Sequence, residues 1–466
     1  MKKIEVVTEK SFYTRVLAIM LPVAAQQAIN MGVNMMDTMM LGSFGEVQLS
    51  ASSLANAFYQ IYQIFCMGIT AGCSILMAQY WGAGRADESK QSFALGMRLT
   101  LLFGTLFTVV TAAAPEGIMK LYSDDPAVIE AGAGYLRITV WIFLIHGFGL
   151  VAAQLMRSVG QPKLGLYVSV ISFAVNIFAN WVFIFGNLGA PRMEIRGAAL
   201  GTLIARISEL VVTFVFILRI DKKLKLTIKD LLRRPSKEIT DKYLKVGLPA
   251  LCSDAMLGFG RTAVSMVIGR MGTVAAAANS MVQVVDRLFT VVIQGISNAA
   301  SIVIGQSIGS GEKHKAQVQG KTLLYMAIAV SAVSCLLFMT VGPFTLRFYT
   351  IAEETARVTR QMMVTYSFLI IFQCIGSVMT KGVLRGGGDT RFLMAADVAF
   401  LWLISVPAGY VSGVVMGMPI YIACVFLRLD DILKSVMCVL RLNSGKWIHE
   451  VSRKQIDPDP DPSDEC

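Results

Sequence analysis

Four oxygen-bearing side chains in the first half of the chain have the types and spacing of a cation site. Asp37 lies inside a long apolar run, and Asn176 and Asn180 lie four residues apart in another, where a helix would place both amides on one face. Counted from the expected helix ends at a rise of about 1.5 Å per residue, Asp37, Asn180 and Thr202 share one depth. Carboxylate, amide and hydroxyl oxygens suit sodium or a proton, so we predict a cation-coupling site from these four residues.

Asp37 is the strongest member of this set. An ionisable group at membrane depth is costly and is usually functional unless a partner neutralises it. No Lys or Arg lies three or four residues from Asp37, and the internal repeat described below places Val264 at the corresponding position of the second half. The alternative is a hydrogen-bonded aspartate that serves packing alone.

Two other charged residues of the first half can form a pair. Arg206 and Glu209 lie three residues apart on one expected helix and can neutralise each other, which favours a structural role. His146 stands alone on an apolar helix and is expected to be a satisfied core residue rather than a proton relay.

Charges in the second half also sum to zero. Asp254 has Arg261 and Arg287 as possible partners, and Asp286 stands beside Arg287, so structural pairing is one interpretation. For Asp254 a functional role is equally open. The secondary candidates for coupling are therefore Asp254, Glu209, Arg206 and Asp286.

The run that carries Asp37 is rich in methionine. The simpler interpretation is that these side chains fill gaps in the packing. The alternative is a pliable wall for varied hydrophobic substrates, because methionine adapts its shape readily. The candidates for a substrate cavity are Met35, Met36, Gln26 and Asn34.

Membrane helices are needed to position these residues. Of the 466 residues 55% are hydrophobic and 16% charged, and the mean hydropathy is +0.61, whereas soluble domains carry about 25% charged residues. Apolar runs of roughly 20 residues recur along the chain and predict helices rather than barrel strands. We expect an all-α integral membrane protein with twelve spans, at 13–42, 51–81, 92–114, 134–156, 164–186, 197–219, 244–269, 276–308, 319–341, 359–383, 392–413 and 419–441.

The net charge of +11 is explained by topology, since no nucleic-acid motif accompanies it and no nucleic-acid partner is expected. The segment 219–245 is rich in Lys and Arg, while the loop 115–131 carries mostly acidic charges. Both termini should then be cytoplasmic. The expected organisation is a cytoplasmic N-terminus 1–12, an N-lobe 13–219, a cytoplasmic linker 220–243, a C-lobe 244–441 and a cytoplasmic, partly disordered tail 442–466.

The two halves match each other at a constant shift of 227 residues. Pro22 corresponds to Pro249 and Gly68 to Gly295, and the motif Gln79-x-x-Gly82-x-Gly84 returns as Gln306-x-x-Gly309-x-Gly311. One register that holds through several helices indicates a duplication. Six helices per copy give both copies one orientation, so we expect two lobes related by a pseudo-two-fold axis along the membrane normal, enclosing a central cavity.

Short motifs spread over both halves make the chain resemble the MATE family, the multidrug and toxic compound extrusion proteins, of the bacterial NorM or DinF type. Each motif is weak alone, but their order and spacing are specific. They are Met36-Asp37-Thr38-Met39-Met40-Leu41-Gly42, Gln79-Tyr80-Trp81-Gly82-Ala83-Gly84, Asn176 to Gly186, Gly197-Ala198-Ala199-Leu200-Gly201-Thr202, Gly305 to Gly311, and Leu384-Arg385-Gly386.

The resemblance implies a secondary active exporter of amphipathic or cationic compounds, driven by inward sodium or protons, in a prokaryotic inner membrane. It implies no cofactor and no metal beyond a transported sodium at Asp37, and a monomer is expected. The sequence departs from some relatives, which carry an aspartate where Cys374 or Asn180 stands here. Mechanisms that need either acid are therefore in question.

Two other functions are weighed against export. A flippase of lipid-linked precursors from the same superfamily would share the two lobes, but such proteins usually have more helices and several cavity arginines. A membrane-embedded enzyme would need a catalytic motif, and the sequence shows no metal-ligand spacing, nucleophile elbow or phosphate loop. We expect a transporter and not an enzyme.

Overall fold

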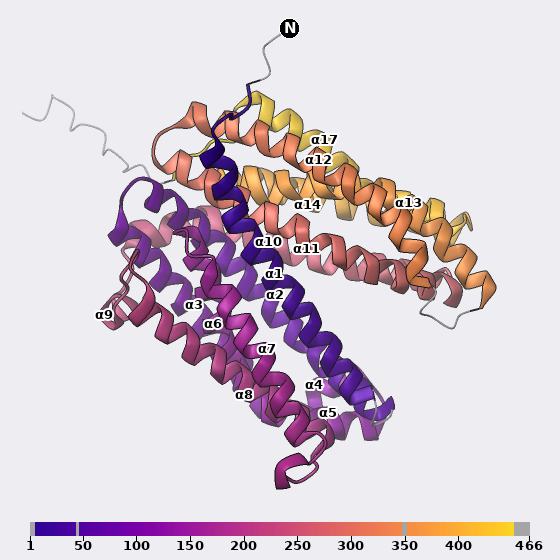
Figure 1. The fold of residues 1–466 in the computed structure, drawn as a ribbon. Coiled ribbons are helices and arrows are strands. Elements are labelled where there is room, and N and C mark those ends of the chain that lie inside the picture. Colours follow the sequence, from indigo (N-terminus) through magenta and orange to yellow (C-terminus); the bar gives the residue numbers. More distant parts are fainter. Residues whose placement is uncertain (1–4, 43–45, 347–351, 452–466) are drawn as a thin grey trace, which may run out of the picture.

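The computed structural model describes residues 5–42, 46–346 and 352–451, and these ranges are helical with short connections. Two helical bundles converge at one end and diverge toward the other (Figure 1). The N-terminus lies at the converging end, and α1 (Lys10–Gly42) runs along the line between the bundles. This architecture confirms the predicted division into an N-lobe and a C-lobe.

The N-lobe contains the first eight α-helices, and short irregular helices follow two of them. After α1 its helices are α2 (Glu46–Gly82), α3 (Ala86–Ala113), α4 (Pro115–Lys120), α5 (Pro126–Thr139), α6 (Ile142–Ser158), α7 (Lys163–Phe183), the short η1 (Asn187–Gly189), α8 (Glu194–Val215) and the π-helical η2 (Phe216–Ile220). One short helix of the linker, α9 (Ile228–Leu232), lies between the lobes in the chain.

The C-lobe repeats this order with long helices first. Its helices are α10 (Lys237–Arg270), α11 (Thr273–Gly309), α12 (Lys313–Thr345), α13 (Glu353–Ser377), η4 (Val378–Leu384), α14 (Thr390–Val398), η5 (Ala399–Ser405), α15 (Val406–Tyr410), η6 (Val411–Val415), α16 (Ile420–Leu427) and α17 (Leu429–Ser444). The segments η4, η5 and η6 are π-helical.

The hydropathy of these helices accounts for ten spans directly. Within the described residues, nine helices are long and apolar enough to cross a membrane, and α5 with α6 makes a tenth if the bent pair counts as one span. The helix α8 and the pair α16–α17 complete the twelve. Both carry charged residues that lower their hydropathy, and those charges find partners inside the lobes, as described below.

The predicted span 134–156 is two helices rather than one. The helices α5 and α6 meet at a bend of 59°. Hydroxyl groups from other helices bond to carbonyls at this break: Thr108 donates to Val140 at 3.3 Å and Tyr62 donates to Phe143 at 2.5 Å. The buried break is thus stabilised by side chains that sequence periodicity does not reveal.

The predicted span 419–441 is also interrupted, at Arg428 between α16 and α17. The Asp430 backbone N–H that the interruption frees donates to the Ser405 hydroxyl at 2.6 Å. Beyond α17, residues 445–451 are docked, with Trp447 buried. The prediction of a partly disordered tail is not contradicted by this ordered part, because the Asp-Pro-rich end lies within 452–466, outside the described residues.

The linker is shorter than predicted, because α10 begins at Lys237 rather than at residue 244. Thr227 and Asp230 form a capping box at the start of α9, and Lys90 of α3 pairs with Asp230 at 3.1 Å. Burial opposes the ionised form of Asp230, but the hydrogen bonds from Thr227 and Lys90 outweigh it and lower the pKa of this carboxyl. These contacts fasten the linker to the N-lobe.

The glycine motifs at the ends of α2 and α11 make equivalent contacts with each other where the two helices cross between the lobes. We call this contact the mirrored crossing. A Cβ at Gly82 would overlap the Gln306 backbone carbonyl, and a Cβ at Gly309 would overlap that of Gln79. The glutamine side chains also cross over: Gln79 Nε2 lies 3.5 Å from the Gly386 carbonyl oxygen, and Gln306 Nε2 donates to the Ser158 carbonyl at 2.6 Å. The duplication predicted from sequence therefore reappears as a two-fold contact at the converging end.

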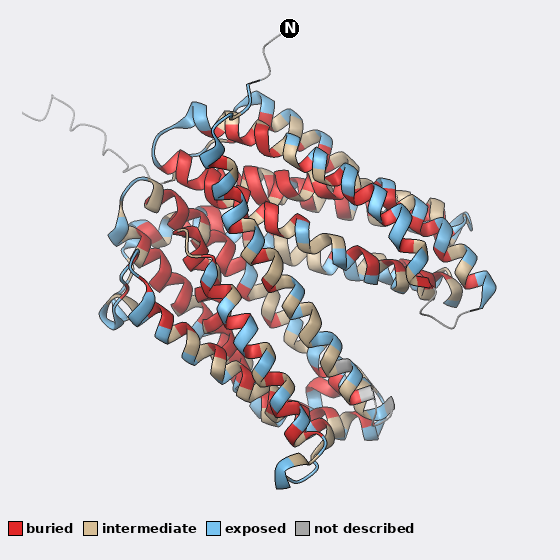
Figure 2. Cartoon of the chain, viewed as in Figure 1, coloured by how far each residue is buried: buried red, intermediate tan, exposed pale blue. Residues whose placement is uncertain are grey.

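Buried residues concentrate inside each bundle and toward the converging end (Figure 2). Many large apolar side chains on the outer faces are well exposed instead, including Leu102 at 65%, Leu336 at 66% and Leu403 at 73%. A belt of exposed leucines on long apolar helices is the surface that a bilayer covers.

Candidate ion-coupling site and central cavity

Asp37 and the two predicted asparagines form a hydrogen-bonded row between α1 and α7. The Asn180 side-chain amide donates to Asp37 Oδ1 at 2.6 Å and to Asn176 Oδ1 at 3.3 Å. Both asparagines are buried, whereas Asp37 is half-buried on the wall of a cavity. The shared depth expected from sequence is thus accompanied by direct contact.

The Asn180 amide oxygen, unlike its nitrogen, has no such partner. Asn180 Oδ1 is buried and accepts no hydrogen bond from the described residues. Gly201 of α8 lies against it so closely that a Cβ at this position would overlap Oδ1. Buried acceptors are nearly always satisfied, so this oxygen is available to an electropositive ligand.

Asp37 and Asn180 together offer hard oxygen ligands. A carboxylate beside an amide carbonyl is a donor set that can hold sodium, and the carboxylate alone can hold a proton. Among the described residues there is no group of three or more His, Cys, Asp or Glu that could form a resident metal centre. The site is therefore suited to a transient cation.

Thr202 belongs to the cavity wall rather than to the hydrogen-bonded row. Its hydroxyl donates to the Ala198 carbonyl one turn earlier on α8, at 2.9 Å. Thr202 and Asp37 line the same cavity. A hydroxyl that donates still has acceptor capacity, so Thr202 can face a cation from the edge of the site.

The cavity beside Asp37 has a volume of about 510 Å³, within the usual range of small-molecule sites. Its walls are mixed: leucine, alanine and phenylalanine side chains alternate with hydroxyls, amides and charged groups. The polar wall residues besides Asp37 and Thr202 include Asn34, Asn56, Gln60, Gln63, Tyr135 and Arg206. Such a lining suits amphipathic molecules.

A smaller cavity of about 110 Å³ adjoins it and shares the wall residues Asn34, Gln63 and Arg206. Here Arg206 and Glu209 form the predicted pair at 2.6 Å. His146 joins them, with Nε2 at 3.2 Å from the Arg206 guanidinium, and its ring stacks on Tyr59. His146 is thus part of a charged cluster, which sequence could not show because its partners lie on other helices.

The four predicted cavity residues of α1 separate in the structure. Asn34 lines both cavities, and Gln26 lines the smaller one, where it accepts a hydrogen bond from the buried Arg157 at 3.1 Å. Met35 and Met36 do not line either cavity, and the Met35 side chain is 58% exposed. Consecutive helix positions point in different directions, so a run of methionines cannot all face one cavity.

Asp254 does not pair as predicted. Its partner is neither Arg261 nor Arg287 but Arg385, which follows η4 and makes a bidentate contact at 2.8 and 3.0 Å. Two parallel charge-assisted hydrogen bonds are the strongest geometry for this pair of groups. The partner is distant in sequence, so local spacing could not identify it.

Asp286 likewise contacts Arg428 at 4.0 Å rather than its neighbour Arg287. Deeper in the C-lobe, Lys434 lies 2.8 Å from Asp430 and 3.5 Å from Asp397. Sequence reasoning missed this buried trio, although Asp430 and Lys434 stand four residues apart on α17. Inside the C-lobe, charges of opposite sign therefore hold helices together.

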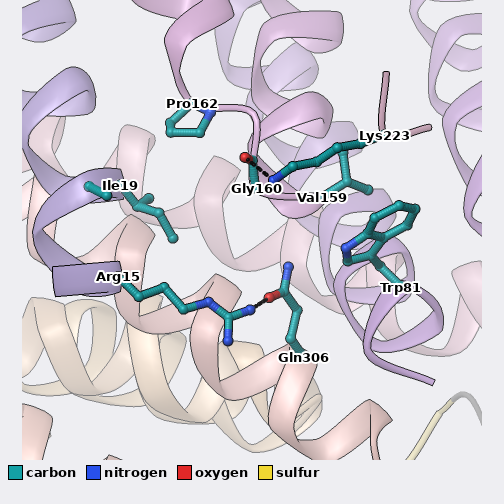
Figure 3. Close-up of a pocket in the computed structure, with 9 residues that line it drawn as sticks. Arg15, Ile19, Trp81, Val159, Gly160, Pro162, Lys223 and Gln306 are labelled. Atoms are coloured by element: carbon teal, nitrogen blue, oxygen red, sulfur yellow. Dashed lines mark hydrogen bonds between the residues drawn. The ribbon is translucent and has the colours of Figure 1, made fainter. Parts of the chain in front are cut away.

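A third cavity, of about 250 Å³, lies where the lobes converge (Figure 3). Arg15 of α1 donates to the Gln306 side chain of α11, and Lys223 Nζ donates to the Gly160 carbonyl at 2.8 Å. None of the predicted site residues lines this cavity. Its contacts join α1 and the linker to both lobes.

Two regions of the chain match the sequence model of the MatE family, residues 22–182 and 249–411. The chain belongs to the MATE family. Its second match starts 227 residues after the first, the same shift that relates the two halves. MATE proteins are transporters, so the chain is a multi-pass membrane transporter and not an enzyme.

Solved structures of related transporters share this fold. A MOP superfamily transporter from Pyrococcus furiosus, described as having reverse polarity in its binding pocket, has a TM-score of 0.84 at 17% identity, over 93% of this chain and 97% of that one. An outward-facing multidrug resistance MATE transporter gives 0.83 at 17% identity, with the same coverage. A MATE transporter in complex with MaL6 gives 0.82 at 18%, again over 93% and 97%. These likenesses establish two lobes of six membrane helices each.

Proposed function

We propose that this MATE transporter exports amphipathic or cationic small molecules in exchange for sodium or protons that move inward. The observation that carries this proposal is the unpartnered Asn180 Oδ1 beside the Asp37 carboxylate, on the wall of a 510 Å³ cavity. One carboxylate on a substrate cavity lets a driving cation and a positively charged substrate compete. Such competition couples the two movements.

The proposed orientation has both termini and the linker in the cytoplasm of a prokaryotic cell, with the protein acting as a monomer in the inner membrane. The crossing of α2 and α11 then closes the cytoplasmic end, and the cavity opens outward. In a background without native cysteines, a cysteine in loop 115–131 should react with an impermeant reagent added outside intact cells. One in segment 221–236 should not react, and the reverse pattern would overturn this orientation.

Transport is tested in proteoliposomes that contain a cationic dye or a fluorescent lipid. Sodium and proton gradients are imposed separately, and dye movement is followed by fluorescence. We expect one of the two gradients to drive the dye against its own gradient. Movement of the lipid without movement of the dye would favour the flippase function instead.

A further inference from the structure

One charged residue of the C-lobe reaches the cavity beside Asp37. Arg287 of α11 lines it, whereas every other described wall residue belongs to the N-lobe. The Arg287 side chain is exposed, and within the described part of the chain it makes no ion pair or hydrogen bond. Arg287 also stands 227 residues after Gln60, which lines the same cavity from α2. The repeat therefore brings equivalent positions of the two lobes to this cavity. The N-lobe position carries the amide of Gln60, and the C-lobe position carries the guanidinium of Arg287.

The formal charges on the cavity wall can be assigned one by one. Arg206 is neutralised by Glu209 at 2.6 Å. Asp37 is held by the neutral Asn180 amide, so its charge has no ionic partner within 4.0 Å among the described residues. Arg287 is equally without one. The cavity thus presents one carboxylate on the N-lobe side and one guanidinium on the C-lobe side, and the two do not pair with each other.

We infer that the preferred substrates are zwitterionic amphiphiles, with a cationic group that binds Asp37 and a carboxylate that binds Arg287. This inference rests on the proposed export function and names its substrate class. The planar guanidinium matches a carboxylate by two parallel hydrogen bonds, which a plain cation cannot use. The mixed walls between the two charges accept the apolar body of the molecule.

This arrangement also separates binding from coupling. A driving cation at Asp37 competes with the cationic group of the substrate and leaves the carboxylate on Arg287 unaffected. A zwitterion in this cavity contacts both lobes, whereas a plain cation depends on the N-lobe alone. Arg287 therefore sets specificity, and Asp37 serves every substrate.

The test uses two forms of one dye: a rhodamine with a free carboxylate, which is zwitterionic, and its methyl ester, which is a cation. Binding to the purified protein is measured by fluorescence anisotropy, and efflux is measured in proteoliposomes. Wild type should bind the zwitterion about tenfold more tightly than the ester, the size expected for a charge-assisted hydrogen bond. Arg287→Gln, which copies the N-lobe residue, should bind both forms equally and still export the ester.

Two variants complete the design. Arg287→Lys keeps the charge and should keep most of the preference, and Arg360→Gln, at an exposed position of α13 away from the cavity, should match wild type. Equal binding of the two dyes by wild type, or an unchanged preference in Arg287→Gln, would overturn the inference about Arg287. Export of the ester in the same experiment would still support the proposed function. If wild type bound and moved neither dye, the inference and the proposed export function would both be contradicted.

Discussion

The two lobes of this transporter share one scaffold, and both contain ion pairs, but the acid on the wall of the N-lobe cavity differs from the acids inside the C-lobe. In the C-lobe, carboxylates meet cations from other helices, as Asp254 meets Arg385 and as Lys434 meets Asp430 and Asp397. In the N-lobe, Asp37 accepts a hydrogen bond from the Asn180 amide and, among the described residues, has no cation within 4.0 Å. Pairing makes charges structural, and an acid that is left without a cation remains available to a driving ion.

Two arginines at equivalent positions of the repeat, Arg157 near the end of α6 and Arg385 directly after η4, show the same contrast. Arg385 of the C-lobe binds the carboxylate of Asp254, whereas Arg157, its counterpart at a shift of 228 residues, binds the neutral Gln26. The difference shows that equivalent positions of a duplicated fold can carry an ion pair in one half and a hydrogen bond to a neutral amide in the other. It follows that substitution of Asp37 should affect coupling, while substitution of Asp254 should affect mainly stability.

Asp37→Asn should have the largest effect. It keeps the size of the side chain but removes its charge, so gradient-driven dye efflux from proteoliposomes should fall to the background of empty vesicles. The melting temperature in detergent should stay near the wild-type value, because no ion pair is lost. Efflux at a near wild-type rate under every gradient would make Asp37 structural and erase the contrast between the lobes.

Asp254→Asn should affect mainly stability. It leaves the partly buried Arg385 without its counter-charge. Breaking a fully buried pair costs about 3–5 kcal/mol, and this partly exposed pair should cost less but still lower the melting temperature. The double variant Asp254→Asn/Arg385→Gln should recover most of this loss, because no unpaired charge remains. Coupling should survive in whatever protein folds. Lost efflux at an unchanged melting temperature would place Asp254 in the transport mechanism.

The mirrored crossing should respond alike in both lobes. Gly82→Ala and Gly309→Ala each force a methyl group against a backbone carbonyl, at a cost of about 1–3 kcal/mol. Thermal unfolding should detect both losses. Gly269→Ala is the matched control, since a Cβ there meets nothing within 4 Å. A loss confined to one of the two variants would show that the crossing is not symmetric in energy.

Asn180→Leu should have the smallest effect. It removes the hydrogen bond to Asp37 and the free amide oxygen, so the apparent affinity for the driving ion should fall about tenfold, as expected for a hydrogen bond to a charged group. Some transport should remain, because Asp37 is intact. Titration of efflux against sodium or pH measures this change, and Thr202→Val should shift it less. An unchanged ion dependence would remove Asn180 from the site.

Sequence predicted the features that repeat or alternate along the chain. Hydropathy predicted the spans, and the internal repeat predicted the two lobes. The depth of Asp37 and Asn180 within their runs predicted a shared level in the membrane but not their hydrogen bond. The partners predicted for Asp254 and Asp286 were wrong, because the observed partners come from helices far away in sequence. His146 and Lys434 were missed as members of clusters for the same reason. The position of Arg287 on the cavity wall depends on how the helices pack, which sequence does not show. Its equivalence to Gln60 in the repeat was the one sequence feature that could have pointed to it.

The crossing of α2 and α11 lies at one end of two long helices, so any relative rotation of the lobes about it would be magnified at their other ends. The 37 residues of α2 extend about 55 Å from Gly82 at the crossing to Glu46. A rotation of about 10° at the glycines would then carry the far tip through about 10 Å. The helix α11 also has 37 residues, so its far tip would move equally far. Backbones that touch through glycine can pivot with little side-chain rearrangement, so small changes in contact there are amplified into the width of the opening at the opposite end.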